Sequence, residues 1–438
     1  MTTVESAVES QVESPLSPAQ PVRGTRKRLD HIDAMRPVKQ AGVVSTHTLL
    51  FFAPVAAGLT VGASLQLLHV TREAFLFVSA CMLAYSVRDR PGIDHRTFWR
   101  RRCALVAVPY LCWTVIYFLV GLPGEHGTPR ADTIHLLYLF GTGYYQLYYL
   151  LVLLEFYALF PFLLILLRKT AGHHGLLLLA SGLVQIALVS TMHWGLVPAW
   201  MQGYWATREV TSYQFYLLAG MVVALHLDEF HDWLCTHVLL IVAGTLAAAV
   251  AAEVWYYLAA DHVVGWLGSS SDPFQPIVIP FNIGAIACIY LIGVALVQRR
   301  RSRRTRAMVQ SGSDNSYGIY LAQVLLITML SWLGWQHLNA YLPWPLVAVI
   351  TVVVVFMACI ALTELLARTP LAKPLTGRTR VSWRRAGAPV GAPGLRVVDG
   401  AGGADPAQAL ATGLPEATAT GLPEEPATAA AMADAIAR

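Results

Sequence analysis

Charged residues are scarce in this sequence. Asp, Glu, Lys and Arg make up 13% of its 438 residues, whereas hydrophobic residues make up 56%. Soluble globular domains carry about 25% charged residues. This composition excludes an ordinary soluble domain and indicates a polytopic membrane protein.

Cysteine is scarce too, and a signal peptide is lacking. The six cysteines form no CxxC pair, which argues against a disulfide framework and against a metal site. The net charge of +5 comes mainly from Arg-rich loops, so we expect no nucleic-acid partner. Residues 1–28 lack the apolar core of a cleaved signal peptide. We expect them to form a disordered cytoplasmic tail.

Long apolar runs are abundant, and each is long enough to cross a bilayer as a helix. They lie at about 37–58, 64–87, 103–122, 146–168, 174–195, 209–227, 237–258, 277–297, 314–335 and 344–367. The sequence therefore predicts an all-α, multi-pass membrane protein with about ten transmembrane helices. The apolar stretch 133–142 is too short to span, and we expect it at the outer interface.

Loop charges predict the orientation. With the N-terminus inside, the inward loops hold fourteen Lys and Arg residues and the outward loops only Arg130 and Arg208. Cytoplasmic loops of membrane proteins carry such an excess. Both termini are therefore predicted to be cytoplasmic, in a protein of the plasma membrane.

The composition changes after about Pro370. Residues 370–438 are rich in Ala, Gly, Pro and Thr, and one hexapeptide occurs twice, at 411–416 and 419–424. Such a segment cannot bury a core, so we expect a disordered cytoplasmic tail. The basic stretch 378–385 is expected beside anionic lipid. The membrane domain is then 29–369.

His47 lies near the middle of the first span, eleven residues after Arg36. Eleven residues are about three helical turns, so both side chains share one face. A titratable residue inside a bilayer is a functional candidate by default. Alternatively, a neighbouring helix satisfies the ring, and Ser45 and Thr46 are placed to hydrogen-bond it.

The second span carries Arg72 and Glu73 on one face with His69, and Ser79 follows on the same stripe. Glu73 is a candidate to orient or charge His47. The alternative is an Arg72–Glu73 ion pair with a purely structural role.

Three further spans carry polar side chains at membrane depth. On the fourth span Glu155 shares a face with Tyr148, and the eighth span carries Asn282. Ser316, Tyr320 and Gln323 form a stripe on the ninth span. These side chains predict a polar cavity, although some could simply hydrogen-bond neighbouring helices.

A cytoplasmic arginine cluster precedes the third span and includes Arg101 and Arg102. It suits the positive-inside rule. With Arg36 it would also suit a donor with several phosphates, such as coenzyme A, because guanidinium groups bind phosphates in bidentate fashion.

These motifs together resemble the integral-membrane acyltransferase family 3, whose members O-acylate bacterial surface glycans. The most specific is Arg36, ten residues and then His47; weaker ones follow in the family's order at 75–83, 98–113, 146–150, 216–220 and 315–321. Three motifs depart from the family. Its second basic motif would end at Leu105, so Arg101 and Arg102 stand in. Its Ser-Gly after the second helix's Phe run is Ser79-Ala80, and its ninth-span His is Gln323 here.

The resemblance implies transfer of a short acyl group, of acetyl or succinyl type, from cytoplasmic acyl-CoA to a hydroxyl of an envelope glycan or glycoside. His47 would be the general base or a transient acyl carrier, with Glu73 beside it. Arg36, Arg101 and Arg102 would bind the donor. The acceptor side of the cavity would include Arg72, Ser79, Tyr148, Glu155, Tyr320 and Gln323. The alternative is a transporter or flippase for a glycan or lipid-linked intermediate, with Arg72, Glu73 and Glu155 as coupling charges.

Overall fold

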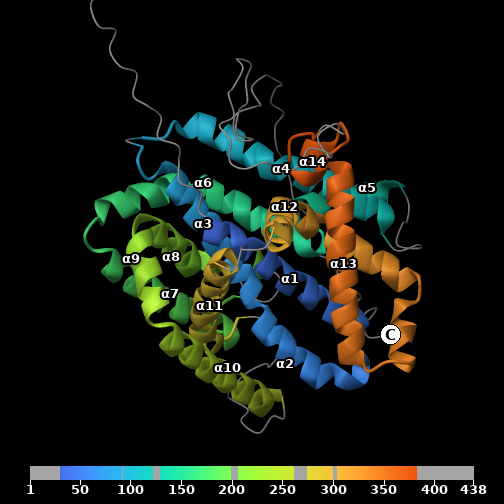
Figure 1. The fold of residues 1–438 in the computed structure, drawn as a ribbon. Coiled ribbons are helices and arrows are strands. Elements are labelled where there is room, and N and C mark those ends of the chain that lie inside the picture. The colour runs from blue at the N-terminus through green and yellow to red at the C-terminus, as the bar shows by residue number, and fades with distance from the viewer. Residues whose placement is uncertain are drawn as a thin grey trace, which may run out of the picture.

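The computed structural model describes residues 30–90, 92–121, 129–198, 206–260, 274–298 and 303–381. These residues form helices and contain no strand. The all-α prediction is therefore confirmed for the described chain (Figure 1). The expected N-terminal tail, 1–28, and most of the expected C-terminal tail, 382–438, lie outside the described residues.

A helix lies at each of the ten predicted spans. The long helices are α1 (Asp30–Phe52), α3 (Val70–Val87), α4 (His95–Val120), α6 (Tyr148–Lys169), α7 (His174–His193), α8 (Gln214–Leu225), α10 (Val238–Ala260), α11 (Val278–Gln298), α12 (Arg303–Trp332) and α13 (Trp344–Leu366). The shorter ones are α2 (Gly58–Leu68), α5 (Pro129–Thr142), α9 (Leu227–Thr236) and α14 (Ala372–Thr376). The 14-residue α5 covers the stretch expected to be too short to span.

Seven of the described helical segments are long and apolar enough to cross a membrane, and a bent pair makes an eighth. The chain is thus a membrane protein with several apolar helices, and a total of ten spans stays a prediction. Among the long helices, α1 and α12 do not qualify. Both are long enough, but they carry too many polar and charged residues.

One predicted span is interrupted, and another ends in a sharp bend. The second consists of α2 and α3, which meet at His69. The sixth runs from the short turn Val210–Tyr213 through α8, and the chain then bends by 99° into α9. The residue at the first break, His69, therefore lies at the N-terminal end of α3.

The polar helix α1 lies in the middle of the bundle (Figure 1). It packs against α11, α12, α13 and α3, and α3 packs in turn along α8. The α3–α8 approach is very close: a Cβ on Gly220 would lie 2.3 Å from the backbone oxygen of Phe77. Only glycine allows two backbones to come so near.

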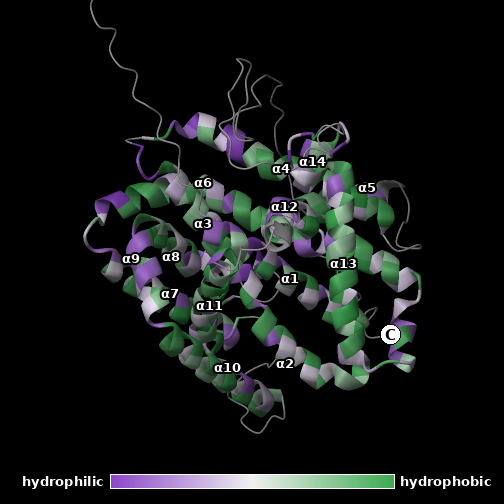
Figure 2. Ribbon diagram, viewed as in Figure 1, coloured by the Kyte–Doolittle hydropathy of each residue, from purple (hydrophilic) through white to green (hydrophobic). Residues whose placement is uncertain are grey.

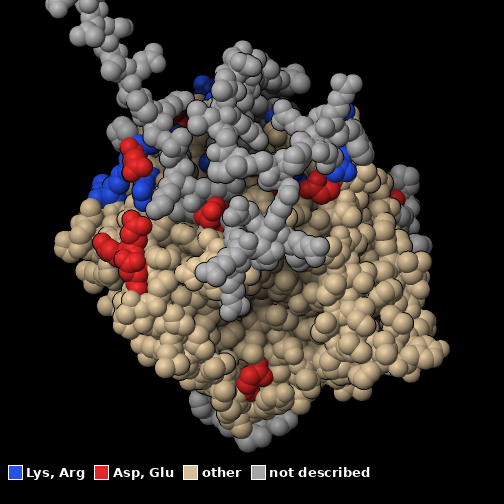
Figure 3. All heavy atoms as spheres, in the orientation of Figure 1, with Lys and Arg blue, Asp and Glu red and all other residues tan. Residues whose placement is uncertain are grey.

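Charge and hydropathy are arranged as a membrane requires. Outer helices α10 and α13 are hydrophobic over most of their length (Figure 2). On the face shown in Figure 3, the Lys and Arg side chains lie in the upper part, above a broad band that is mostly uncharged. This band suits the hydrocarbon core of a bilayer.

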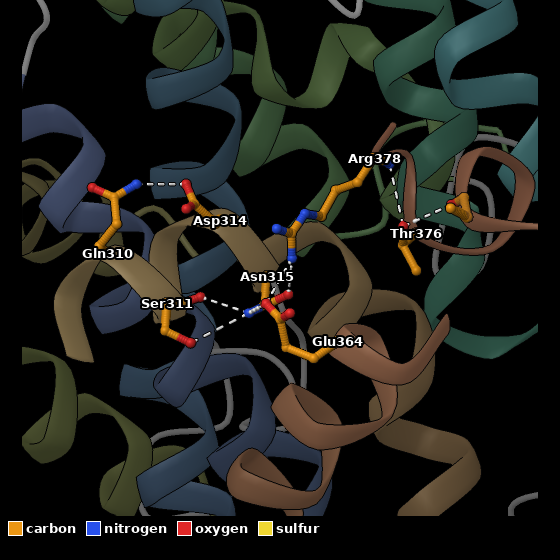
Figure 4. A network of polar contacts seen from close by, with 8 residues as sticks. Gln310, Ser311, Asp314, Asn315, Glu364, Thr376 and Arg378 are labelled. Atoms are coloured by element: carbon orange, nitrogen blue, oxygen red, sulfur yellow. Dashed lines mark hydrogen bonds and ion pairs between the residues drawn. The ribbon is translucent and has the colours of Figure 1, made fainter. Parts of the chain in front are cut away.

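The chain after α13 folds back onto the bundle (Figure 4). Arg378 Nη1 donates to Glu364 Oε1 at 2.9 Å and to Asn315 Oδ1 at 2.5 Å. Trp113 Nε1 donates to the carbonyl oxygen of Leu375 at 3.0 Å. These contacts hold residues 370–381 in place. The start that we predicted for the disordered tail, residue 370, is therefore too early in the chain. Arg378, expected at the lipid surface, instead pairs with Glu364.

Candidate functional site

A cavity of about 270 Å³ opens beside the middle of α1. Its lining comes from α1, the α2–α3 junction, the start of α6, the turn at Ala206–Arg208 and α12. The lining residues are Val43, Thr46, His47, Leu50, His69, Thr71, Arg72, Phe75, Tyr145, Gln146, Tyr148, Tyr149, Arg208 and Tyr320. Helices far apart in the sequence therefore converge on His47.

His47 presents an imidazole with proton-accepting capacity to this cavity. Its Nδ1 is buried and has no hydrogen-bond partner within the described residues. Ser45 and Thr46, expected as possible partners, donate instead to carbonyls of their own helix, at 2.9 Å and 3.1 Å. This follows from geometry, because Ser and Thr hydroxyls in a helix reach the carbonyl four residues earlier.

Tyr145 covers the ring of His47. The two ring centroids lie 5.1 Å apart with 53° between the planes. Tyr145 has a φ of +35°, which is rare for a bulky residue. Strained backbone of this kind concentrates at functional sites, and here it places an aromatic ring against the candidate base.

Glu73 lies next to the cavity and does not line it. Its Oε1 is 3.5 Å from Arg72 Nη2, and its side chain is almost fully buried. No hydrogen bond or ion pair joins Glu73 to His47 in the described structure. The pairing with Arg72, which the sequence left open as the alternative, is thus the one formed.

Arg72, Tyr148 and Tyr320 line the cavity as predicted. The Tyr320 hydroxyl donates to the backbone oxygen of Gln146. Phe75, one turn after Arg72, contacts Tyr149 and Tyr320 with ring centroids 5.2 Å and 5.9 Å apart. These aromatic rings form one wall of the cavity.

Ser79, Glu155 and Gln323 do not line the cavity. Ser79 is partly buried two turns further along α3. Gln323 is fully buried in α12. Glu155 is exposed on α6, and its Oε2 accepts a hydrogen bond from the backbone N–H of Val210 at 2.9 Å. It therefore anchors the turn that follows Arg208.

Arg36 lies on α1, whereas Arg101 and Arg102 lie on α4, and these two helices pack against different neighbours. Arg36 Nη2 lies 3.5 Å from Asp33 Oδ1 on α1. Arg101 and Arg102 lie in the first two turns of α4, which packs on α6. Asp94 caps this helix by accepting from the N–H of Thr97, and hydrogen bonds from the Thr97 hydroxyl and N–H lower the pKa of the Asp94 carboxyl. A common phosphate site for the three arginines stays a prediction.

Two residues that line the cavity and one buried near it were not among the predicted site residues. Arg208 contributes a guanidinium from the turn Ala206–Arg208, and Tyr145 covers His47. Lys39 is buried two turns before His47, with its Nζ 3.3 Å from the centroid of the Phe75 ring. A lysine within a predicted span was a usable signal for the last, and Arg208 was one of only two basic residues in the outward loops.

A family model described as an acyltransferase domain, that of acyltransferase family 3, matches residues 30–364. The chain belongs to acyltransferase family 3. The match begins at the start of α1 and ends in α13, so it includes every residue that lines the cavity. Arg378 lies beyond the matched residues, whereas its partners Asn315 and Glu364 lie within them. Searches of curated proteins and of solved structures gave no match.

Proposed function

We propose that this protein transfers a short acyl group from cytoplasmic acyl-CoA to a hydroxyl of a cell-envelope glycan or glycoside. One observation carries the proposal: His47, placed ten residues after Arg36 as in the family motif, lines a buried cavity with an unpartnered Nδ1. Membership of acyltransferase family 3 supports the reaction class.

The reaction needs a base, and His47 supplies it. An imidazole nitrogen accepts the proton of the acceptor hydroxyl while the oxygen attacks the thioester carbonyl. The C–S bond then breaks, and the coenzyme A thiolate leaves and takes up a proton. General base catalysis of this kind contributes about 10²–10⁴-fold. A route in which His47 first carries the acyl group itself uses the same nitrogen as nucleophile.

The donor enters from the cytoplasmic end of α1. Arg36 lies about 16 Å from His47 along the helix, a span that the extended arm of coenzyme A can cross. Its guanidinium, together with those of Arg101 and Arg102, suits the phosphates of the donor. On this proposal, both chain termini and the arginine-rich loops lie on the cytoplasmic side of the plasma membrane.

The acceptor enters from the opposite end of the cavity. Tyr148, Tyr145 and Tyr320 provide faces and hydroxyls that suit a sugar ring. Glu73 acts through Arg72, whose guanidinium it holds at 3.5 Å. Glu155 acts as a positioning residue through the turn that carries Arg208.

A transporter or flippase is the second candidate, and the buried Arg72–Glu73 pair beside a cavity favours it. Buried ion pairs often mark transport pathways. The two candidates differ in what becomes of the polymer when the protein is absent.

The test compares the surface polysaccharide of the parent strain, a deletion strain and a strain carrying His47→Ala. Transferase function predicts polymer of full length that lacks its acyl esters in both mutants, measured by NMR of the purified polysaccharide. Polymer trapped inside the deletion strain supports the transporter. Normal ester content in the His47→Ala strain, with normal membrane levels of the protein, contradicts the role given to His47.

A further inference from the structure

A lysine is buried in the bundle between Arg36 and His47. Lys39 follows Arg36 by three residues on α1 and precedes His47 by eight, and it is only 3% exposed. Its Nζ forms no hydrogen bond or ion pair with any described residue. Buried charges in membrane proteins are normally paired. Lys39 therefore lacks the counter-ion that a lysine in this position normally has.

The aromatic face of Phe75 supports the ammonium group of Lys39. Nζ lies 3.3 Å from the centroid of the Phe75 ring, and an aromatic face stabilises a desolvated cation. Phe75 itself lines the cavity that holds His47. The ammonium group therefore adjoins a wall of the cavity, and its backbone lies about 12 Å before His47 along α1 by helix rise.

Arg36 is a second cation beside Lys39. Residues three apart on a helix are neighbours, with Cβ atoms about 5–6 Å apart, and like charges at this spacing destabilise the helix. Asp33 lies 3.5 Å from the Arg36 guanidinium and balances it, but no described carboxylate balances Lys39. Helical side chains tilt toward the N-terminus, so the flexible Lys39 side chain can reach toward Arg36. An anion bound between the two cations would relieve their repulsion.

The two cations connect the surface to the cavity. The Arg36 side chain is 34% exposed, whereas Lys39 is buried and contacts the lining residue Phe75. A ligand that is anchored at Arg36 and extends toward His47 passes Lys39 on the way. Coenzyme A thioesters have this form, because a pyrophosphate stands at one end of the pantetheine arm and the thioester at the other.

We propose that Lys39, together with Arg36, binds the pyrophosphate of the acyl-CoA donor. The inference rests on the proposed function, which supplies the donor. Without the donor, Phe75 stabilises the ammonium group. With the donor bound, the ammonium group turns to the phosphate oxygens, and the thioester lies beside His47. Lys39 is then a donor-binding residue that takes no part in the chemical step.

Calorimetry on the purified full-length protein in nanodiscs tests the proposal. The probes are coenzyme A, 3′-dephospho-coenzyme A and inorganic pyrophosphate, none of which carries an acyl group. We expect Lys39→Met to weaken the binding of all three by about tenfold or more, because it removes a charge-assisted contact. Lys39→Arg, which keeps the charge, should retain part of the affinity.

Lys169→Met is the matched control. Lys169 is exposed in the last turn of α6, and the variant should bind all three probes like wild type. The melting temperature separates a binding role of Lys39 from a structural one. Lys39→Met removes a buried charge that has no ion pair, so it should leave the melting temperature unchanged or raise it. A lower melting temperature with unchanged affinity would mean that Lys39 serves the fold, which overturns the inference.

Each binding result decides between the two proposals. If wild type binds coenzyme A and Lys39→Met binds it within about threefold, the inference is overturned and the proposed function stands. A loss seen with coenzyme A but not with 3′-dephospho-coenzyme A overturns the assignment to the pyrophosphate. Pyrophosphate that fails to compete with coenzyme A on wild type overturns it too, even if Lys39→Met does not fold. Binding of pyrophosphate without binding of coenzyme A keeps the anion site and contradicts the proposed donor.

Discussion

Helices α1 and α10 have the same length, 23 residues, and opposite chemistry. Ten residues of α1 are buried, and half of them are polar or charged. Only four residues of α10 are buried, and none of them is charged. In a membrane the hydrophobic surface faces outward to lipid, so the most apolar helices form the shell. The polar helix is left for the middle, where it carries the cavity.

The largest difference in stability is expected between Ala variants of two carboxylates, Glu73 on α3 and Glu253 on α10. Glu73→Ala leaves Arg72 buried without its partner, which costs about 3–5 kcal/mol. We expect a strongly lowered melting temperature of the detergent-purified protein, or loss of folded protein. Glu253 is only half buried and has no ion pair within the described residues. Glu253→Ala should change the melting temperature little, and equal losses in both variants would refute the contrast.

Two glycines, one on the closely packed helix α8 and one on α10, test the same comparison between buried and peripheral helices. A Cβ on Gly220 would meet the Phe77 backbone at 2.3 Å, whereas a Cβ on Gly244 of α10 meets nothing within 4 Å. Gly220→Ala should destabilise the protein by about 1–3 kcal/mol through overpacking of α8 on α3. Gly244→Ala should stabilise it by up to about 1 kcal/mol through helix propensity. Chemical denaturation in mixed micelles measures both, and a stable Gly220→Ala variant would mean that the two helices pack less closely.

The smallest effect is expected at Arg378, in the segment that follows α13. Arg378 bonds Glu364 and Asn315, but Arg378 and Glu364 are each about a quarter to a third exposed. Solvent screening limits such a pair to about 1 kcal/mol. Arg378→Ala should therefore lower stability slightly and increase proteolysis after α13. Arg380→Ala, which removes one hydrogen bond to the Arg368 carbonyl, is the control and should leave both unchanged.

The positions of the helices could be predicted from the sequence, because an apolar run of about 20 residues has few other structures open to it. The breaks and bends in these helices could not be predicted from the sequence. The run 64–87 was predicted as one span although its helix breaks at His69, and the 99° bend between Leu225 and Leu227 lies at His226, just before the acidic Asp228 and Glu229. We predicted residues 370–381 to be disordered because of their composition. Three side-chain contacts, which composition does not reveal, hold this segment against the bundle.

The candidate site could be predicted only for those residues whose position on a helix face follows from helix periodicity. His47, Arg72, Tyr148 and Tyr320 were found because each is a polar side chain within a predicted span, and all four line one cavity. Periodicity gives the face of a helix and not the neighbour that it meets. Glu73 therefore binds Arg72 and not His47, and Glu155 and Gln323 lie outside the cavity. Arg208 belongs to a loop, for which periodicity says nothing.

The most direct test of the account is the rate of acyl-CoA-dependent coenzyme A release by the protein in proteoliposomes. Acetyl-CoA and succinyl-CoA serve in turn as donors, and polysaccharide lacking acyl esters from the deletion strain is the acceptor. The account predicts that His47→Ala in the central helix lowers the acceptor-dependent rate by at least about 100-fold. His237→Ala, just before the outer helix α10, should keep the wild-type rate. A His47→Ala rate within a few-fold of wild type, in folded protein, would contradict the claim that the central polar helix carries the chemistry.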